Sequence, residues 1–410
     1  MPLNGMAQNQ TPSTRLGTDA LQNNPTLPEG ERDKPVDFSP TPAAPPQMPK
    51  ILEDIRVSVQ AYQVTGFDQV GADKWAEVLS EFTGDNRSFE DMANAAATVT
   101  RTLQGEWGLY LAYAYIPAQD LKNGTVEIRV LPGILDKVEV IWPDQELAVD
   151  RDIIQAHLSA LRPGTLIQVR EVERVVFLLN DLRGVGVRFG IQPGLETGTA
   201  TLVAEPFNTD TAVAEVTLDD QGSRFAGELR ATATVSIHSP AGRGDSLTLT
   251  HLRSDTGGLE FSLLGYSTPI GSDGLKVGVN LSKVNYSFEE NSLPLGLEGD
   301  STTVSAFGLY PFYRSRNFNL FATFGMDRRY YSDRLRLIGS ETRKDIQATQ
   351  LGLVSDARDA WGGGGLSSAH LRLIRSSVDY AAGRPGGLDD AAHAMKWEWE
   401  YSRLQTLVPG

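Results

Sequence analysis

The chain has 410 residues, with 37 Lys+Arg against 52 Asp+Glu, a formal charge of −15 and no cysteine. The lack of cysteine excludes disulfides, thiolate zinc sites and thiol nucleophiles, and the acidic balance argues against a nucleic-acid-binding surface. No apolar run of about 18 residues occurs, which excludes transmembrane helices but not membrane-spanning strands, because barrel strands carry only an alternating pattern.

Proline and charge divide the chain into segments. Residues 1–50 hold 10 of the 22 prolines and a single aromatic residue, Phe38. This composition predicts a disordered linker or plug region that buries no core. Most of the acidity falls in the middle segment, residues 51–207, which carries 13 Lys+Arg and 23 Asp+Glu.

Residues 51–136 predict a small α+β unit. An alternating strand over 55–64 is followed by a helix with Trp75 and Phe82 on its buried face, and a second helix opens at Ser88 with Asp91 as its capping-box partner. Strands over 110–116 and 125–130 complete the predicted order β-α-α-β-β.

Residues 137–207 repeat this order. The pattern predicts a strand over 138–142, a helix near 150–161, a second helix at about 170–183, and strands over 186–191 and 199–205.

Residues 208–410 predict almost pure β structure. About ten alternating stretches, each near ten residues long, are separated by Gly, Asp, Asn and Ser turns. Strands of about 9–11 residues suit a tilted bilayer crossing, whereas globular strands average about 5–6 residues. The stripe Trp397, Trp399 and Tyr401 is typical of an interfacial aromatic girdle. A large soluble β-sandwich or β-helix gives the same alternation.

Three blocks carry a family resemblance. The stretch 108–138 resembles the POTRA domain of two-partner secretion transporters, the haemolysin secretion/activation family. Its motif residues are Pro117, Gln119, Asp120, Leu121, Gly124, Gly133 and Ile134. Residues 173–185, which include Asn180, resemble the end of the second POTRA unit of that family. Residues 218–249 resemble its first barrel hairpin through Gly222, Gly227, Arg230, Gly244 and Asp245. The family usually has Asn and Thr where this chain has Asp220 and Ala226.

The resemblance implies a Gram-negative outer-membrane protein. It would have POTRA 1 at 51–136, POTRA 2 at 137–207, both periplasmic, and the N-terminal part of a barrel of about sixteen strands at 208–410. Its partners would be outer-membrane lipid and a large, unfolded β-helical exoprotein, exported without ATP. We expect a monomer with no cofactor, no metal and no nucleic-acid partner. A barrel-assembly or lipid-handling POTRA-barrel protein and a soluble β-rich adhesin are the alternatives.

Both ends of the sequence depart from that family. No signal peptide opens the chain, and it stops at Leu407-Val-Pro-Gly after about ten of the sixteen strands. We therefore expect a fragment or a mis-delimited gene whose barrel cannot close.

An unfolded client can add a strand to an exposed sheet edge, where main-chain hydrogen bonds supply affinity and side chains supply selectivity. The predicted strand over 109–116 is the candidate client-binding surface, with Tyr110, Tyr113 and Tyr115 as contact residues.

The sequence shows no catalytic constellation, so we expect no enzyme. The five histidines are scattered (157, 238, 251, 370 and 393). Arg243-Gly-Asp245 and the glycine-rich stretch 361–365 are interpreted as turns. Arg328, Arg329, Arg372 and Arg375 either line a barrel lumen or form salt bridges at its rim.

Overall fold

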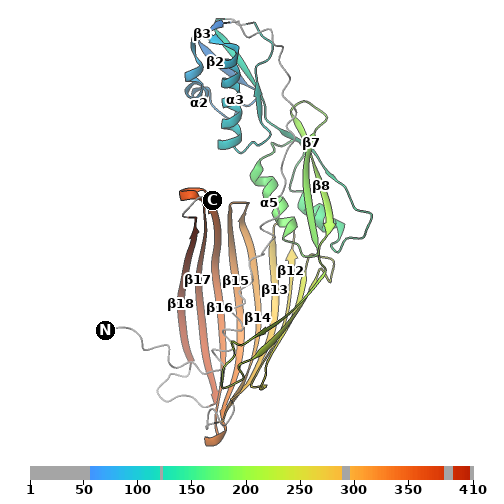
Figure 1. Cartoon of the computed structure of the whole chain (residues 1–410), viewed down its shortest axis with the longest axis vertical. Helices are drawn as coiled ribbons and strands as arrows, with labels where there is room; N and C mark the ends of the chain where they lie inside the picture. The colour runs from blue at the N-terminus through green and yellow to red at the C-terminus, as the bar shows by residue number, and fades with distance from the viewer. Residues whose placement is uncertain (1–55, 121–122, 289–295, 383–390, 407–410) are drawn as a thin grey trace, which may run out of the picture.

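The computed structural model describes residues 56–120, 123–288, 296–382 and 391–406. Two small α+β units are followed by one ten-stranded antiparallel sheet (Figure 1). The predicted fold class, α+β followed by all-β, is confirmed. The Pro-rich region 1–50 lies outside the described residues, and the unit boundaries at 136/137 and 207/208 stay predictions.

The first unit pairs a three-stranded sheet with two helices. Its elements are β1 (Arg56–Val59), β2 (Ala61–Thr65), α2 (Ala72–Val78), the 3-10 turn η2 (Ser80–Phe82), β3 (Gly84–Ser88), α3 (Phe89–Glu106), β4 (Tyr113–Tyr115) and β5 (Thr125–Leu131). The strand order is β2-β5-β4, in which β2 is parallel and β4 antiparallel to β5. Trp75, Val99 and Ile128 lie in the core between sheet and helices.

The first predicted strand of this unit is wrong as a single element. The chain breaks at Gln60, because β1 pairs with β3 while β2 pairs with β5 in another sheet. The backbone N–H of Gln60 donates to the carbonyl of Gly124 at the break. Strand β3 was not predicted, since its sequence Gly-Asp-Asn-Arg-Ser has turn residues and is held as a strand only by β1.

The first predicted helix is also shorter than its apolar spacing indicates. Helix α2 ends at Val78, and Phe82 lies in the 3-10 turn. The Ser80 hydroxyl donates to the carbonyl of Glu77 at 2.8 Å, a local bond that competes with helix continuation.

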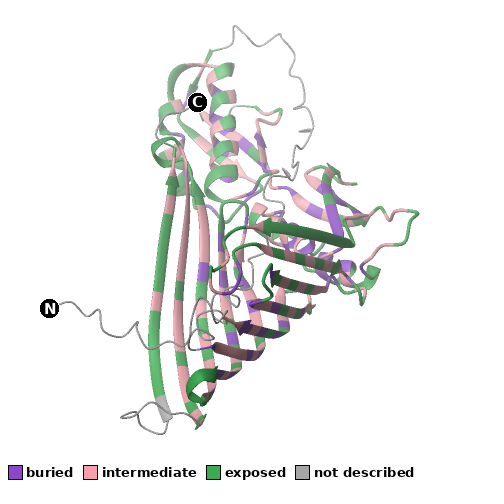
Figure 2. Cartoon of the chain, turned by 60° about the horizontal axis from the view of Figure 1, so that its bottom comes forward, coloured by how far each residue is buried: buried purple, intermediate pink, exposed green. Residues whose placement is uncertain are grey.

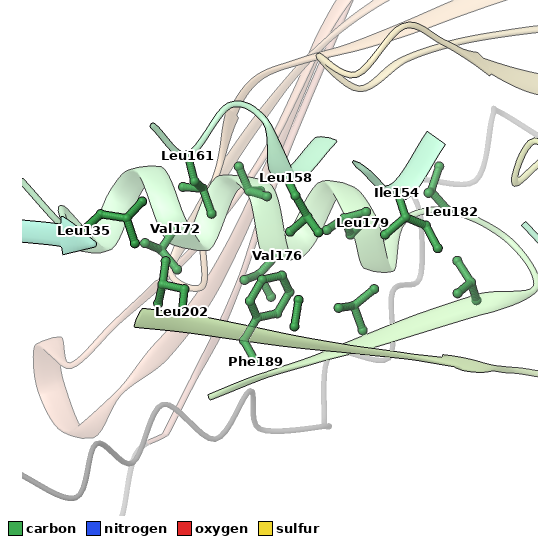
Figure 3. Close-up of a cluster of buried hydrophobic side chains, with 14 of the residues drawn as sticks. Leu135, Ile154, Leu158, Leu161, Val172, Val176, Leu179, Leu182, Phe189 and Leu202 are labelled. Carbon is green, nitrogen blue, oxygen red and sulfur yellow. The ribbon is translucent and has the colours of Figure 1, made fainter. Parts of the chain in front are cut away.

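The second unit repeats the topology of the first. It contains β6 (Ile134–Val140), α4 (Arg151–Leu158), α5 (Val169–Asn180), β7 (Val185–Pro193) and β8 (Thr199–Asn208), with strand order β6-β8-β7. Again the first strand runs parallel to the central one and the other edge strand runs antiparallel. Side chains of both helices, among them Ile154 of α4 and Val176 of α5, pack with Phe189 of the sheet strand β7 in one core (Figure 3). The predicted β-α-α-β-β repeat is confirmed.

The large sheet is a chain of antiparallel hairpins in sequence order from β9 to β18. Its strands are β9 (Ala212–Asp219), β10 (Arg230–His238), β11 (Ser246–Ser254), β12 (Leu259–Ile270), β13 (Leu275–Ser287), β14 (Leu297–Arg314), β15 (Phe318–Leu335), β16 (Ser340–Asp359), β17 (Gly365–Ala382) and β18 (Ala391–Gln405). The predicted number of strands is confirmed. The predicted length is wrong for β14 to β17, which have 18 to 20 residues. A bilayer crossing uses about ten residues of such a strand, so its ends extend beyond the apolar layer.

Helix α3 begins with the predicted capping box. The Ser88 hydroxyl accepts from the Asp91 N–H at 3.1 Å, and the Asp91 carboxylate accepts from the Ser88 N–H at 2.8 Å. These hydrogen bonds from Ser88 lower the pKa of Asp91 below its ordinary value of 3.8.

We expect Ser88→Ala to destabilise α3 by about 1 kcal/mol, because an orphan helix N–H loses its partner. Hydrogen exchange of the detergent-solubilised chain should show α3 amides exchanging roughly fivefold faster in the variant. A group with a lowered folded pKa stabilises above its unfolded pKa, so the difference should persist at neutral pH and shrink below pH 3.8. Exchange rates equal to wild type at pH 7 would contradict this role of the capping box.

Candidate functional site

The candidate client-binding strand β4 lies at the edge of the first sheet. It pairs with β5 on one side, and in the described part of the chain no strand pairs with its other side. Tyr113 and Tyr115 lie on one face of β4 with their rings stacked, 6.4 Å between centroids and 9° between planes. Ala114 between them is buried in the core. The Ala114 N–H, on the side of β4 away from β5, donates to the Thr100 hydroxyl at 2.9 Å. What β4 offers an extended segment is therefore mainly the aromatic surface of the two tyrosines.

The structure does not place Tyr110 on this strand. Residues 109–112 form a turn in which the Ala112 N–H donates to the carbonyl of Leu109 at 2.9 Å. Leu109 and Ala112 are both buried, so the turn fills the core where the sequence predicted a longer strand. Tyr110 is 40% exposed on this turn. The predicted strand over 109–116 is therefore corrected to Tyr113–Tyr115, and client binding by the three tyrosines stays a prediction.

Partial burial raises the pKa of Tyr113 above its ordinary value of 10. Its phenol is therefore neutral at physiological pH and can donate a hydrogen bond. The paired residues on β5 are Leu131 for Tyr113 and Arg129 for Tyr115.

The Pro-x-Gln-Asp-Leu motif continues the β4 ladder after the strand has ended. Gln119 uses its side-chain amide as a substitute for a strand residue: its Nε2 donates to the carbonyl of Glu127 at 2.8 Å, and its Oε1 accepts from the Glu127 N–H at 2.7 Å. Gln119 Nε2 also reaches the carbonyl of Pro117 at 3.4 Å. Asp120 is exposed, and Leu121 lies outside the described residues.

Asn180 performs the same task in the second unit. Its Oδ1 accepts from the Val187 N–H at 2.9 Å, and its Nδ2 donates to the Val187 carbonyl at 3.4 Å. In each unit, a motif amide therefore satisfies both backbone groups of one strand residue. The sequence singled out both amides but did not indicate this pairing.

Two motif glycines have positive φ where the chain is crowded. Gly124 (φ +69°) has its carbonyl against Gln60, where β1 passes into β2, and a Cβ there would lie 2.9 Å from the Gln60 side chain. Gly133 (φ +78°) begins the passage between the two units, and a Cβ there would clash with Leu111. Both positions require glycine.

The first barrel-type hairpin is held by its motif residues. Arg230 pairs with Asp219 across the β9–β10 ladder at 2.7 Å. Gly222 donates its N–H to the carbonyl of Glu228, and Gly227 has a φ of +104°.

The Arg243-Gly-Asp245 sequence is the β10–β11 turn, as predicted. The buried Asp245 carboxylate accepts from the N–H groups of Ala241 and Arg243 and from the Tyr266 hydroxyl. Gly244 has a φ of +73° and donates its N–H to the Ser239 hydroxyl.

One face of the ten-stranded sheet carries a continuous apolar belt. Paired residues on neighbouring strands lie on the same face of the sheet, so the strand register shows which apolar residues share this face. Most of its large side chains are exposed. The belt comprises Val216, Leu218, Val235, Ile237, Leu249, Leu264, Val279, Leu281, Val304, Phe324, Met326, Leu351, Leu353, Leu371, Trp397 and Trp399. Exposed and less exposed residues alternate along the strands in Figure 2. An apolar area of this size facing solvent is typical of a surface that meets lipid.

The opposite face carries a row of polar side chains across its strands, together with buried apolar ones such as Phe261, Val284 and Phe321. Asn280, Ser305, Asp327 and Gln350 follow one another across neighbouring strands on it, and Asp327 forms an ion pair with Arg329 at 2.6 Å. The four arginines that the sequence assigned either to the barrel lumen or to salt bridges at the rim lie on two different faces of the sheet. Arg329 and Arg372 lie on the face opposite the belt, whereas Arg328 and Arg375 share the belt face.

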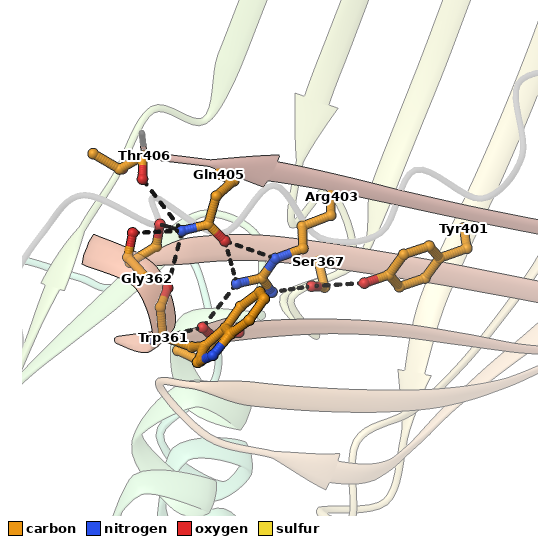
Figure 4. Close-up of polar contacts among 9 residues, drawn as sticks. Trp361, Gly362, Ser367, Tyr401, Arg403, Gln405 and Thr406 are labelled. Atoms are coloured by element: carbon orange, nitrogen blue, oxygen red, sulfur yellow. Dashed lines mark hydrogen bonds and ion pairs between the residues drawn. The ribbon is translucent and has the colours of Figure 1, made fainter. Parts of the chain in front are cut away.

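The aromatic stripe on β18 belongs to the belt. Trp397, Trp399 and Tyr401 are all more than half exposed. At the end of this strand, Arg403 binds Asp359 and Gln405 donates to the carbonyls of Trp361, Gly362 and Gly364 (Figure 4). These contacts hold the glycine-rich β16–β17 turn.

Among the described residues, every helix is too short or too polar to span a bilayer. In the same part of the chain, no group of three His, Asp or Glu side chains is placed to hold a metal. The buried His157 bonds the carbonyl of Ile153 through Nδ1 at 2.8 Å, and burial lowers its pKa. This histidine is a satisfied structural residue.

Two family models match the chain. A "POTRA domain, ShlB-type" matches residues 57–133, and "Haemolysin secretion/activation protein ShlB/FhaC/HecB" matches residues 198–350.

Among curated proteins, the chain is 23% identical over 285 residues to the heme/hemopexin transporter protein HuxB of Haemophilus influenzae. This alignment covers 70% of this chain and 50% of HuxB. The chain is 24% identical over 202 residues to the outer membrane transporter CdiB of Dickeya dadantii, covering 48% of this chain and 35% of that protein. The chain thus spans at most about half the length of these two relatives.

The solved structure of CdiB from Escherichia coli has the same fold. It superposes with a TM-score of 0.65 at 17% identity, covering 95% of this chain and 72% of that chain. With a ShlB-type POTRA domain followed by a ShlB/FhaC/HecB-type segment, the chain is related to the haemolysin secretion/activation proteins, the two-partner secretion transporters.

Proposed function

We propose that this protein is an outer-membrane transporter that takes up an unfolded secreted protein in the periplasm and exports it by two-partner secretion. The apolar belt on one face of the ten-stranded sheet is the observation that carries the proposal. It supports a sheet with lipid on the belt face and the polar path of the client on the other face. The relatives are named as transporters, which supports a transport function.

The units at 51–136 and 137–207 act in the periplasm in this proposal, and residues 208–410 form barrel wall. Strand β4 supplies the first contact with the client. An extended client segment lies along this edge strand, and Tyr113 and Tyr115 contact alternate side chains of that segment. The client is a large β-helical exoprotein, unfolded before export, and the transporter works as a monomer.

Tyr113→Pro should weaken export of the client several-fold, because proline removes one of the two stacked rings and stiffens the edge strand that the client must contact. Secretion and client pull-down are measured side by side in cells that carry the client gene. Gln145→Pro is the control, since Gln145 is exposed in the loop between β6 and α4. Heat-modifiable gel mobility should be the same in all variants. Undiminished client binding by Tyr113→Pro would reject β4 as the contact surface.

Leu351→Arg tests the lipid-facing assignment. Leu351 is exposed within the belt on β16, and a charge at the lipid face costs about 2–4 kcal/mol near the bilayer midplane. We expect poor membrane insertion and loss of heat-modifiable mobility. Gln350→Arg is the matched control. Gln350 precedes Leu351 on β16 and points to the opposite face, so the same charge there should not prevent membrane insertion. Equal insertion of both variants would contradict a lipid-facing belt.

A further inference from the structure

Helix α5 of the second unit lies against three successive turns of the large sheet (Figure 1). The first is the β10–β11 turn. The N–H of Arg183, just after the helix, donates to the carbonyl of Gly244 at 3.2 Å, and a Cβ at Gly244 would meet Leu182 at 2.9 Å. This turn also contacts the loop before α4, since the Ser239 hydroxyl donates to the carbonyl of Ala148 at 2.7 Å.

The β12–β13 turn is the second. Arg174 on α5 donates to the carbonyl of Asp273 at 3.1 Å and to that of Pro311, on β14, at 3.0 Å. Leu178 points at the same turn, because a Cβ at Gly274 would clash with its side chain. Leu178 is only 5% exposed. The helix thus buries Leu178 outside the face that packs on its own sheet.

The third contact is an ion pair at the β14–β15 turn. Arg314 donates through two nitrogens to the Asp181 carboxylate, at 2.8 and 3.0 Å, and the two side chains are only 10% and 14% exposed. The guanidinium lies over the ring of Phe177 at 4.8 Å and also donates to Asn319 Oδ1 at 2.9 Å. A bidentate pair with a stacked ring fixes both distance and orientation.

The other end of α5 meets the first unit. The Val169 N–H, at the helix start, donates to the carbonyl of Gly108 at 3.1 Å. Gly108 directly precedes the turn that leads into β4. Leu166, just before the helix, packs against the core of the first unit. One helix of 12 residues, about 18 Å long, therefore connects the client-binding unit with the ends of the sheet strands.

We propose that α5 is a rigid spacer that holds the β4 edge at a fixed position relative to the periplasmic end of the sheet, with Arg314 as its positioning residue. This role rests on the proposed function, because it matters only if β4 hands a client segment to the barrel. Loss of Arg314 leaves the carboxylate of Asp181 without its partner at a mostly buried interface, so the docked orientation is no longer favoured.

The test uses the full-length protein in outer-membrane vesicles. The sequence has no cysteine, so the pair Glu173→Cys with Arg316→Cys reports docking through a short bifunctional thiol crosslinker. Glu173 Oε2 and the Arg316 N–H lie 3.4 Å apart at this interface. We expect efficient crosslinking in the parent, a several-fold loss with Arg314→Asp, and restoration by the exchange Arg314→Asp with Asp181→Arg. Arg314→Lys should be intermediate, since lysine forms no bidentate pair.

The matched control is Arg334→Asp, which breaks an exposed pair with Glu341 at 3.3 Å and should leave crosslinking unchanged. Secretion should follow crosslinking across the series, while photocrosslinking of client at Tyr113 and heat-modifiable mobility stay at the parental level.

Parental crosslinking in Arg314→Asp would overturn the docking contact, and a loss that the charge exchange does not restore would overturn the ion pair as its basis. Parental secretion despite lost crosslinking would overturn the positioning role. A parent that exports no client refutes the proposed function instead, and the crosslinking series still decides whether α5 is docked.

Discussion

Backbone hydrogen bonding at strand edges is the constraint on which this structure depends. Inside a bilayer no water satisfies an unpaired N–H or C=O, so a spanning sheet must pair its strands along their length. Strands β10 to β17 each have a hydrogen-bonded partner strand on both sides. The small sheets in front of them work under the opposite rule. They lie outside the apolar layer, where an edge such as β4 can stay open to a partner.

In the small sheets, two motif side-chain amides satisfy backbone groups at strand edges. Gln119 occupies both backbone groups of Glu127, where β4 has ended, and Asn180 does the same for Val187 on β7. Each amide makes a hydrogen-bonding pattern that another strand would make. An incoming segment is therefore kept away from Glu127 and Val187, and the Thr100 hydroxyl likewise occupies the Ala114 N–H on β4.

Much of the fold was predictable because it is local. Ser88 and Asp91 are three residues apart, so their capping box could be predicted from sequence, and strict alternation identified the ten long strands. The errors arose where tertiary pairing decides. The strand is interrupted at Gln60 because β1 and β2 belong to different sheets. Tyr110 lies in a turn and not in the predicted strand, because Leu109 and Ala112 on either side of it are buried in the core. The partnership of Arg314 with Asp181 joins residues 133 positions apart, which no periodicity indicates.

The belt and the α5 contacts together indicate how the sheet is oriented relative to the membrane. The turns that α5 touches all lie at one end of the sheet, so this end faces the periplasm if the proposed orientation holds. A transporter without ATP can use only the free energy of client binding and folding, and this energy directs export only if capture occurs at the correct end. A single hydrogen bond from each turn would allow the small units to swing, because each contributes only about 1 kcal/mol. Three contacts along one rigid helix, with Arg314 held between Asp181 and Phe177, restrict that motion. In the proposed function they keep the β4 edge on the side where the client arrives.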